Sequence, residues 1–535
     1  MGATVLVLVQ PANRRAAQGA LDKAGVQLPD RLREFLDVWD FGSSETIGPG
    51  YGADDLEWAP TVPDGESLYA GFNENNKGNG KGPSGAALAA DADFVASSPH
   101  TFHDNGHLIV KPVDQYKGGA PAPHPIMTLI QRAEALWARK LQRQSRSLED
   151  CAKEYRRRYR RNPPRGFDKW WEYAKANRVI LTDEYDQIHH DLEPFWALEP
   201  SDFVHRSKVM SQREESFTLM FKDGRISIEG PEGHLRRAKD LGDLMSRFAH
   251  FVPDVNLTFT RHDQPAVALD WTHKERMYEL ASQGEYFGPS DWVAGGDPRL
   301  SNWANECPDN SPLRKVELEA RREIESNKKV HWKSDLQAYK TPESRERSYI
   351  FDHTKSMDLC QHPEIMPLHG FTMASGTDPG PLVPLFTFAK TNVHADVLVT
   401  PLEQYSDTYI GYDPPWEKKP INKLMWRGST TGVDFDELND WRNSQRARLH
   451  FLSHEQQGER NVLVAEADKA MQERKLPLKD MNAKYMDTSF SGGPVQCDDA
   501  TCDYMRQAVD FRPTMGLDES YQVRMVFSQT TRVGC

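Results

Sequence analysis

The clearest alternation of apolar and polar residues predicts a strand near the middle of the chain. Val255, Leu257 and Phe259 are apolar and the residues between them are polar, which is the period of a half-buried strand. Asp263 follows three residues after this strand, and Pro265 comes two residues later. Open α/β sheets bind ligands beyond the carboxyl ends of their strands, so Asp263 is a candidate general base. A turn-capping role before Pro265 explains the same residue equally well.

A second apolar run, Leu424-Met425-Trp426, predicts the end of a buried strand. The turn that follows begins with Arg427, Gly428, Ser429 and Thr430. Its backbone N–H groups and the planar guanidinium of Arg427 suit phosphate oxygens. The next segment, 434–453, is predicted to be a helix. An ordinary strand–helix turn is the alternative interpretation of this pattern.

Apolar residues that recur every three or four positions predict several helices. They lie at 126–141, 148–159, around the PPRGFDKWW motif, at 235–248 and at 313–327. Short apolar runs predict two further strands, Ala3–Val9 and Ala395–Val399. Helices and strands that follow one another in this way predict an α/β protein with more than one domain.

Composition shifts divide the chain into four predicted regions. Residues 1–122 form a variable N-terminal extension, in which the Gly- and Asn-rich segment 74–85 is a flexible loop. The linker 118–125 closes this extension, and 123–200 is a helical region. The two remaining regions, 201–415 and 416–535, are each predicted to hold strands and helices.

Net charge limits the binding partners. The 535 residues carry a formal charge of −13, which argues against a protein that holds nucleic acid by bulk positive charge. The basic run between Lys153 and Arg161 is more typical of a solvated helix face than of a nucleic-acid patch. The apolar run Ala3–Val9 is too short for a membrane span, and we expect none in this chain.

The cysteine and histidine spacings predict no metal site. Six cysteines occur without a CxxC pair. The cluster from His189 to Glu193 contains two adjacent histidines, which point to different faces of a helix. Cys497 and Cys502 are close enough for a small disulfide loop, and two free thiols fit the spacing as well.

Seven short motifs occur in order between Pro123 and Phe527. They are PPRGFDKWW, DEYDQIHHDLEPFW, RHDQP, MDLCQHPEIMPLHG, HADVLVTP, KLMWRGSTTG with the following Trp441 and Arg446, and ESYQVRMVF. Together they resemble glycosyltransferase family 90, in particular its fungal branch of capsule-associated xylosyltransferase-like proteins. Protein O-glucosyltransferases are animal members of that family.

The resemblance implies a GT-B-like fold, with two Rossmann-like halves facing a cleft: an acceptor-side domain at 201–415 and a donor-side domain at 416–535. It implies an inverting, metal-independent transfer of xylose or glucose from UDP-xylose or UDP-glucose to a hydroxyl of a glycan or glycoprotein. Asp263 matches the family's base. Arg427, Gly428 and Ser429, with Thr430 in the same turn, match its diphosphate-binding segment. The UDP-sugar is a co-substrate, and no further cofactor is expected.

The same resemblance implies a place in the lumen of the endoplasmic reticulum or Golgi, which favours a disulfide between Cys497 and Cys502. The family continues for longer after the ESYQVRMVF motif than this chain does, so we expect an incomplete donor-side half. Residues 525–527 are then a strand at an open sheet edge, and 528–535 a disordered tail. A catalytically inactive carbohydrate-binding or interaction protein on the same fold is the alternative function.

Overall fold

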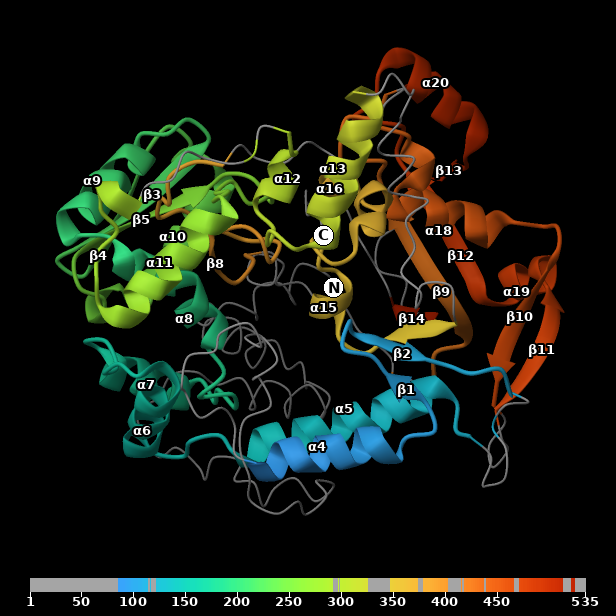
Figure 1. Cartoon of the computed structure of the whole chain (residues 1–535), viewed down its shortest axis with the longest axis horizontal. Helices are drawn as coiled ribbons and strands as arrows, with labels where there is room; N and C mark the ends of the chain where they lie inside the picture. The colour runs from blue at the N-terminus through green and yellow to red at the C-terminus, as the bar shows by residue number, and fades with distance from the viewer. Residues whose placement is uncertain are drawn as a thin grey trace, which may run out of the picture. The chain divides into compact units, whose positions relative to one another are not determined.

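The computed structural model describes most of the chain from Gly85 onward, and all of these residues belong to the unit Pro60–Cys535 (Figure 1). The described residues are 85–113, 116, 122–291, 297, 299–325, 347–373, 379–402, 415, 418–436, 439–465, 471–512 and 521–524. The predicted strand Ala3–Val9, residues 74–84 of the predicted loop, residues 118–121 of the linker, and residues 525–535 lie outside them. Within the described residues the protein is mixed α/β, with several small sheets, none of which is closed.

The N-terminal described part is mainly helical, and the helices predicted at 126–141, 148–159 and around PPRGFDKWW are present. Its helices are α4 (Gly85–Ser97), α5 (Pro125–Gln142), α6 (Leu148–Tyr159), α7 (Phe167–Ala176), α8 (Asp186–Leu192), the 3-10 helix η4 (Glu193–Ala197) and α9 (Pro200–Ser211). Ser147 separates α5 from α6 because its hydroxyl accepts from the Asp150 N–H and caps the second helix. Strands β1 (Thr101–Phe102), β2 (His107–Ile109) and β6 (Ser348–Ile350) form a small antiparallel sheet.

A five-stranded mixed sheet contains the predicted central strand. Its order is β4 (Arg225–Glu229), β3 (Ser216–Lys222), β5 (Val255–Thr260), β7 (Phe386–Thr387) and β8 (Val397–Leu398). Strand β3 pairs antiparallel with both β4 and β5, whereas the pairs β5–β7 and β7–β8 are parallel. The strand prediction for β5 is confirmed, whereas β8 is shorter than the predicted Ala395–Val399. Helix α10 (Arg236–Ser246) packs on β4 and β3, as the amphipathic pattern at 235–248 predicted.

Both faces of β5 are covered near its carboxyl end. Phe259 packs among buried aromatic and aliphatic side chains, and Thr258 and Thr260 on the other face are also buried. The Thr258 hydroxyl is satisfied by a 3.0 Å hydrogen bond with the Thr218 hydroxyl on β3. Asp263 therefore follows a strand end that is held firmly on both sides.

The 3-10 helix η5 (Ala249–Phe251) precedes β5, and the segment after β5 forms mostly short helices around a disulfide. These are α11 (Trp271–Gln283), η6 (Pro289–Asp291), α12 (Asn302–Asn305), α13 (Pro312–Glu325), α15 (His353–Ser356), η8 (Pro363–Leu368) and α16 (Gly370–Met373). Cys307 and Cys360 are bonded, with Cα atoms 5.4 Å apart, inside a buried cluster that includes Trp303 and Leu313. This disulfide was not predicted, because its cysteines are 53 residues apart.

A four-stranded parallel sheet occupies the C-terminal part. Its order is β13 (Phe511–Arg512), β12 (Met486–Ser491), β9 (Ile421–Gly428) and β14 (Tyr521–Arg524), so β14 is at the edge among the described strands. In sequence order this is 3-2-1-4, which matches four neighbouring strands of the doubly wound order 3-2-1-4-5-6. The connecting elements are η10 (Trp441–Asn443), α18 (Gln445–His454), the hairpin β10 (Glu459–Val464) and β11 (Gln472–Pro477), α19 (Leu478–Tyr485) and α20 (Asp499–Ala508). Helices α18 and α19 pack against β12 (Figure 1).

Two boundaries in this part differ from the sequence prediction. The helix predicted for 434–453 begins only at Gln445, because Ser444 caps it and Phe435 instead pairs with Cys497 in an isolated parallel bridge. Arg427 and Gly428 belong to β9 itself and do not follow it. Cys497 and Cys502 form the expected disulfide, with Cα atoms 5.5 Å apart, so that prediction is confirmed.

Candidate functional site

Asp263 lies just beyond the carboxyl end of β5 and is half-buried. Its carboxylate accepts a hydrogen bond from Arg237, which α10 supplies. The same guanidinium donates to the Arg261 carbonyl at 2.7 Å and lies 5.0 Å from the centre of the Phe388 ring. Arg237 therefore holds both the side chain of Asp263 and the backbone before it.

The segment after Asp263 is anchored by a buried carboxylate that sequence reasoning did not single out. Asp396 accepts from the backbone N–H groups of Ala266 and Val267, both at 2.9 Å. Burial raises the pKa of Asp396 to about 6, against the effect of these two hydrogen bonds. The sequence feature that could have identified Asp396 is its place within the mostly apolar HADVLVTP motif, because a buried carboxylate needs hydrogen-bond partners.

Arg427 is buried in β9, and its guanidinium is engaged inside the protein. It donates to the Asp487 carboxylate and carbonyl on β12, both at 2.8 Å, and to the Trp426 carbonyl at 2.9 Å. Its Nε atom is buried and has no hydrogen-bond partner. Gly428 follows, and a side chain there would collide with the Trp426 ring, at 2.6 Å from an added Cβ.

The polar turn after β9 is held by a second arginine, Arg446, in the first turn of α18. Its Nη1 donates to the Ser429 carbonyl at 2.8 Å and to the Thr431 hydroxyl at 2.7 Å. The Thr430 hydroxyl both donates to the Val495 carbonyl and accepts from its N–H, each at 2.9 Å. The turn is thereby fixed in one conformation.

Two strand ends meet at this point. Strands β9 and β12 are parallel, with Gly428 opposite Phe490, so the turn 429–432 and the segment 492–496 follow at the same edge of the sheet. The Gly432 N–H donates to the Gln496 side chain at 2.8 Å. The carboxyl edge of a parallel sheet is where ligands bind in open α/β folds, so this edge is the second candidate site.

The structure brings Arg427, Gly428, Ser429 and Thr430 together, and it places Asp263 on a different sheet. The segment between the two sheets contacts the polar turn at α16. An added Cβ on Gly370 would lie 2.8 Å from the Gly432 Cα, which leaves no room there for a side chain.

The sequence analysis named Arg446 only as part of a motif. Its position two residues after the helix cap Ser444 is the sequence feature that could have marked it.

The histidine cluster that begins at His189 has packing partners. His189 stacks on Tyr159, with ring centres 4.1 Å apart, and His190 stacks on Tyr278 at 5.4 Å. Burial lowers the pKa of each histidine to about 4. Asp191 accepts from Lys390 at 2.6 Å. In the described ranges no group of three or more His, Cys, Asp or Glu side chains has the arrangement of a metal site.

Comparisons with known proteins add no further evidence. No protein-family model matches the chain, and neither the curated proteins nor the solved structures contain a match. None of the helices in the described part of the chain is long and apolar enough to cross a membrane.

Proposed function

We propose that this protein is an inverting, metal-independent glycosyltransferase that moves xylose or glucose from a UDP-sugar to a hydroxyl of a glycan or glycoprotein. The observation that carries the proposal is the rigid polar turn at the carboxyl end of β9, in a sheet of order 3-2-1-4. The motifs that resemble glycosyltransferase family 90 supply the reaction type.

The donor diphosphate is proposed to lie on this turn. The backbone of the turn before Gly432 and the charge of the Arg446 guanidinium are proposed to stabilise the leaving UDP. Arg427 lies in the strand that leads into the turn, and its Nε is the part of its guanidinium without a partner. In this arrangement Gly428 keeps the backbone close to the Trp426 ring, and Ser429 and Thr430 set the path of the turn.

Asp263 is proposed as the general base of a single displacement. Its carboxylate takes the proton of the acceptor hydroxyl while that oxygen attacks C1 of the sugar. The bond between C1 and the diphosphate oxygen breaks, and its electron pair leaves with UDP. Arg237 fixes the carboxylate so that one oxygen keeps a constant direction.

The proposal includes a GT-B arrangement, with the mixed sheet on the acceptor side and the parallel sheet on the donor side. It also includes residence in the lumen of the endoplasmic reticulum or Golgi. Two disulfides, Cys307–Cys360 and Cys497–Cys502, support this location because disulfides persist in oxidising compartments.

The decisive experiment measures UDP released from UDP-xylose and UDP-glucose, with and without a glycoprotein acceptor. Acceptor-dependent release supports the transferase. One observation favours the second candidate, an inactive carbohydrate-binding protein: Arg427 and Asp263 both have partners inside the protein. Acceptor binding without any UDP release, from either donor, would establish that candidate and exclude the transferase.

Replacement of Arg427 by lysine is expected to weaken UDP binding by about 1–3 kcal/mol, or roughly 5- to 150-fold, because an ammonium cannot reproduce the planar fork that holds Asp487 and the strand end before the turn. Calorimetric titration with UDP measures the effect. Arg474→Lys, at an exposed position on β11, is the matched control. A folded Arg427→Lys protein with unchanged UDP affinity would remove Arg427 from the donor site.

A further inference from the structure

A disulfide lies directly beside the turn 429–432, called the donor turn below. Cys497 and Cys502 are bonded, with Cα atoms 5.5 Å apart, and both residues are half-buried. By contrast, Cys307 and Cys360 have exposed fractions of only 0% and 3%. Of the two disulfides in the described residues, Cys497–Cys502 is therefore the more open to a reductant.

The residues just before this disulfide hold the donor turn. The Val495 N–H donates to the Thr430 hydroxyl, and that hydroxyl donates to the Val495 carbonyl, each at 2.9 Å. The Gly432 N–H donates to the Gln496 side chain at 2.8 Å. The Gln496 carbonyl accepts from the Phe435 N–H at 2.9 Å. Whatever fixes the position of 495–496 therefore also fixes the donor turn.

The chain upstream of this segment restrains it little. Gly492 and Gly493 are both exposed, and an added Cβ on either would meet no heavy atom within 4 Å. Glycine has the widest choice of backbone conformations. Gln496 has a φ of 54°, in the left-handed region that a residue with a side chain keeps only when its surroundings impose it. The contacts that impose it therefore lie downstream and across the bridge to Phe435.

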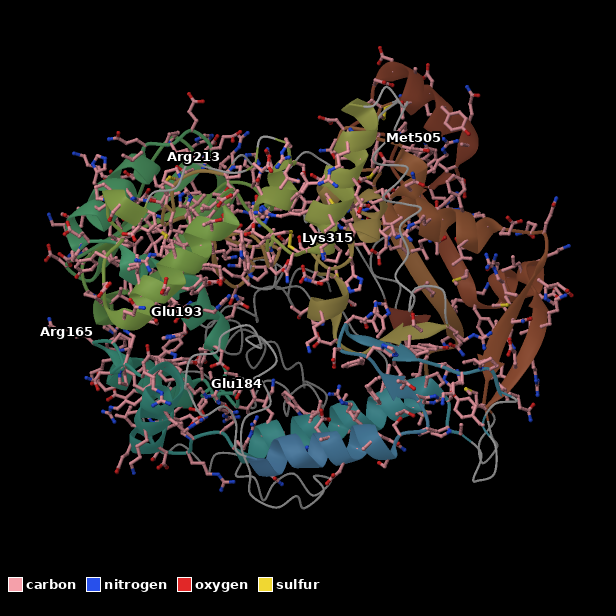
Figure 2. All side chains as sticks on the ribbon, viewed as in Figure 1. Arg165, Glu184, Glu193, Arg213, Lys315 and Met505 are labelled. Carbon is pink, nitrogen blue, oxygen red and sulfur yellow. A yellow bond between two sulfur atoms is a disulfide. The ribbon has the colours of Figure 1, made fainter. Side chains whose placement is uncertain are left out.

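The disulfide ties the segment to helix α20, which is itself fixed. Met505 of this helix, labelled in Figure 2, is buried in the hydrophobic cluster that contains Trp426. Cys502 lies near the start of the same helix. Its bond to Cys497 therefore transmits the fixed position of α20 to the neighbouring Gln496.

We propose that the Cys497–Cys502 disulfide holds the donor turn in its binding conformation, and that a dithiol that reduces it weakens donor binding. The inference rests on the proposed function, because it concerns the regulation of the same site. Without the bond, Gln496 leaves its left-handed conformation and its side chain withdraws from Gly432. Molecules in which this has happened lack the turn that the diphosphate needs.

The reduction is a thiol–disulfide exchange. One thiolate of the dithiol attacks one cystine sulfur, the sulfur–sulfur bond breaks, and the other cysteine leaves as a thiolate that takes up a proton. The second thiol of the dithiol then displaces the first cysteine. The cystine gains two electrons and two protons, and the dithiol becomes a disulfide.

Reduction of the full 535-residue chain by dithiothreitol, without denaturant, tests the inference. Mass spectrometry after thiol alkylation shows whether Cys497 and Cys502 are reduced while the buried disulfide stays intact. Hydrogen exchange measures the amides of 429–435 and 495–498, and calorimetric titration measures UDP binding. We expect faster exchange in both segments. UDP binding should weaken about tenfold, because apparent affinity falls with the fraction of molecules that keep the binding conformation.

Two controls separate loss of the bond from other effects. The double variant Cys497→Ser/Cys502→Ser should bind UDP as weakly as the reduced protein and should not respond to dithiothreitol. Oxidised dithiothreitol, which has no thiol, should change neither measurement. In transfer assays, loss of the bond should raise the KM for the UDP-sugar and leave the KM for the acceptor unchanged, a split that general loosening of the fold would not produce.

The inference is overturned if the reduced protein binds UDP as tightly as the oxidised protein, and the proposed function then still stands. Unchanged exchange at 429–435 after reduction overturns it too, as does a Cys497–Cys502 bond that dithiothreitol leaves intact. An oxidised protein that binds no UDP contradicts the donor site itself, and the proposed regulation falls with it.

Discussion

Replacement of Asp263 by asparagine is expected to slow sugar transfer by about 10²-fold or more, because the variant keeps the shape of the side chain and loses its basicity. The amide oxygen still accepts a hydrogen bond from Arg237, so the local structure should persist. Initial rates of UDP release in the presence of acceptor, at saturating donor, measure the loss.

The control for this prediction is Asp243→Asn, which removes the same charge from an exposed residue on α10. It should transfer sugar at the unchanged rate. UDP affinity should also be unaffected in Asp263→Asn, since the base acts on the acceptor and not on the diphosphate. Full turnover by Asp263→Asn would show that another group takes the proton.

Removal of the Cys307–Cys360 disulfide, by replacing both cysteines with alanine, is expected to lower the free energy of unfolding by about 4 kcal/mol. The bond joins residues 53 positions apart and so restricts a long loop in the unfolded chain. Removal of Cys497–Cys502, which spans only 5 positions, should cost about 2 kcal/mol.

Urea denaturation followed by circular dichroism measures both losses, and the two double variants serve as controls for each other. Each replaces two half-cystines with alanine, so the comparison isolates loop length. Equal losses, or a larger loss for the short loop, would contradict the loop-entropy explanation.

Regular apolar spacing made the local elements predictable. The two-residue period found β5 at its observed bounds, and the three- and four-residue spacing found α6 at its observed bounds. The prediction for 434–453 failed at its beginning because a long-range partner, Cys497, takes the backbone of Phe435 into a bridge. A single sequence shows spacing within a segment, but it does not show which distant strand will pair with it.

The candidate residues illustrate the same limit. The sequence placed Arg427 near a strand end, but its burial depends on Asp487, which a separate strand brings beside it. Asp396 and Arg237 were not predicted for the same reason, since each acts on a segment more than twenty residues away. The hydroxyl-rich turn could be recognised from its own residues, whereas its distant partner Val495 and the ion pairs between elements could not.

The pairing of β9 with β14 has a consequence for synthesis on the ribosome. Strand β14 is made roughly 90 residues after β9, and at roughly 5–20 residues per second this delay lasts about 5–20 s. For more than half of that time β12 has not been made either, and afterwards β12 can pair with one side of β9 while the other side still has no parallel partner from β14. An unpaired strand edge attracts other chains. The nascent protein is therefore expected to need a holding chaperone at β9 until β14 emerges.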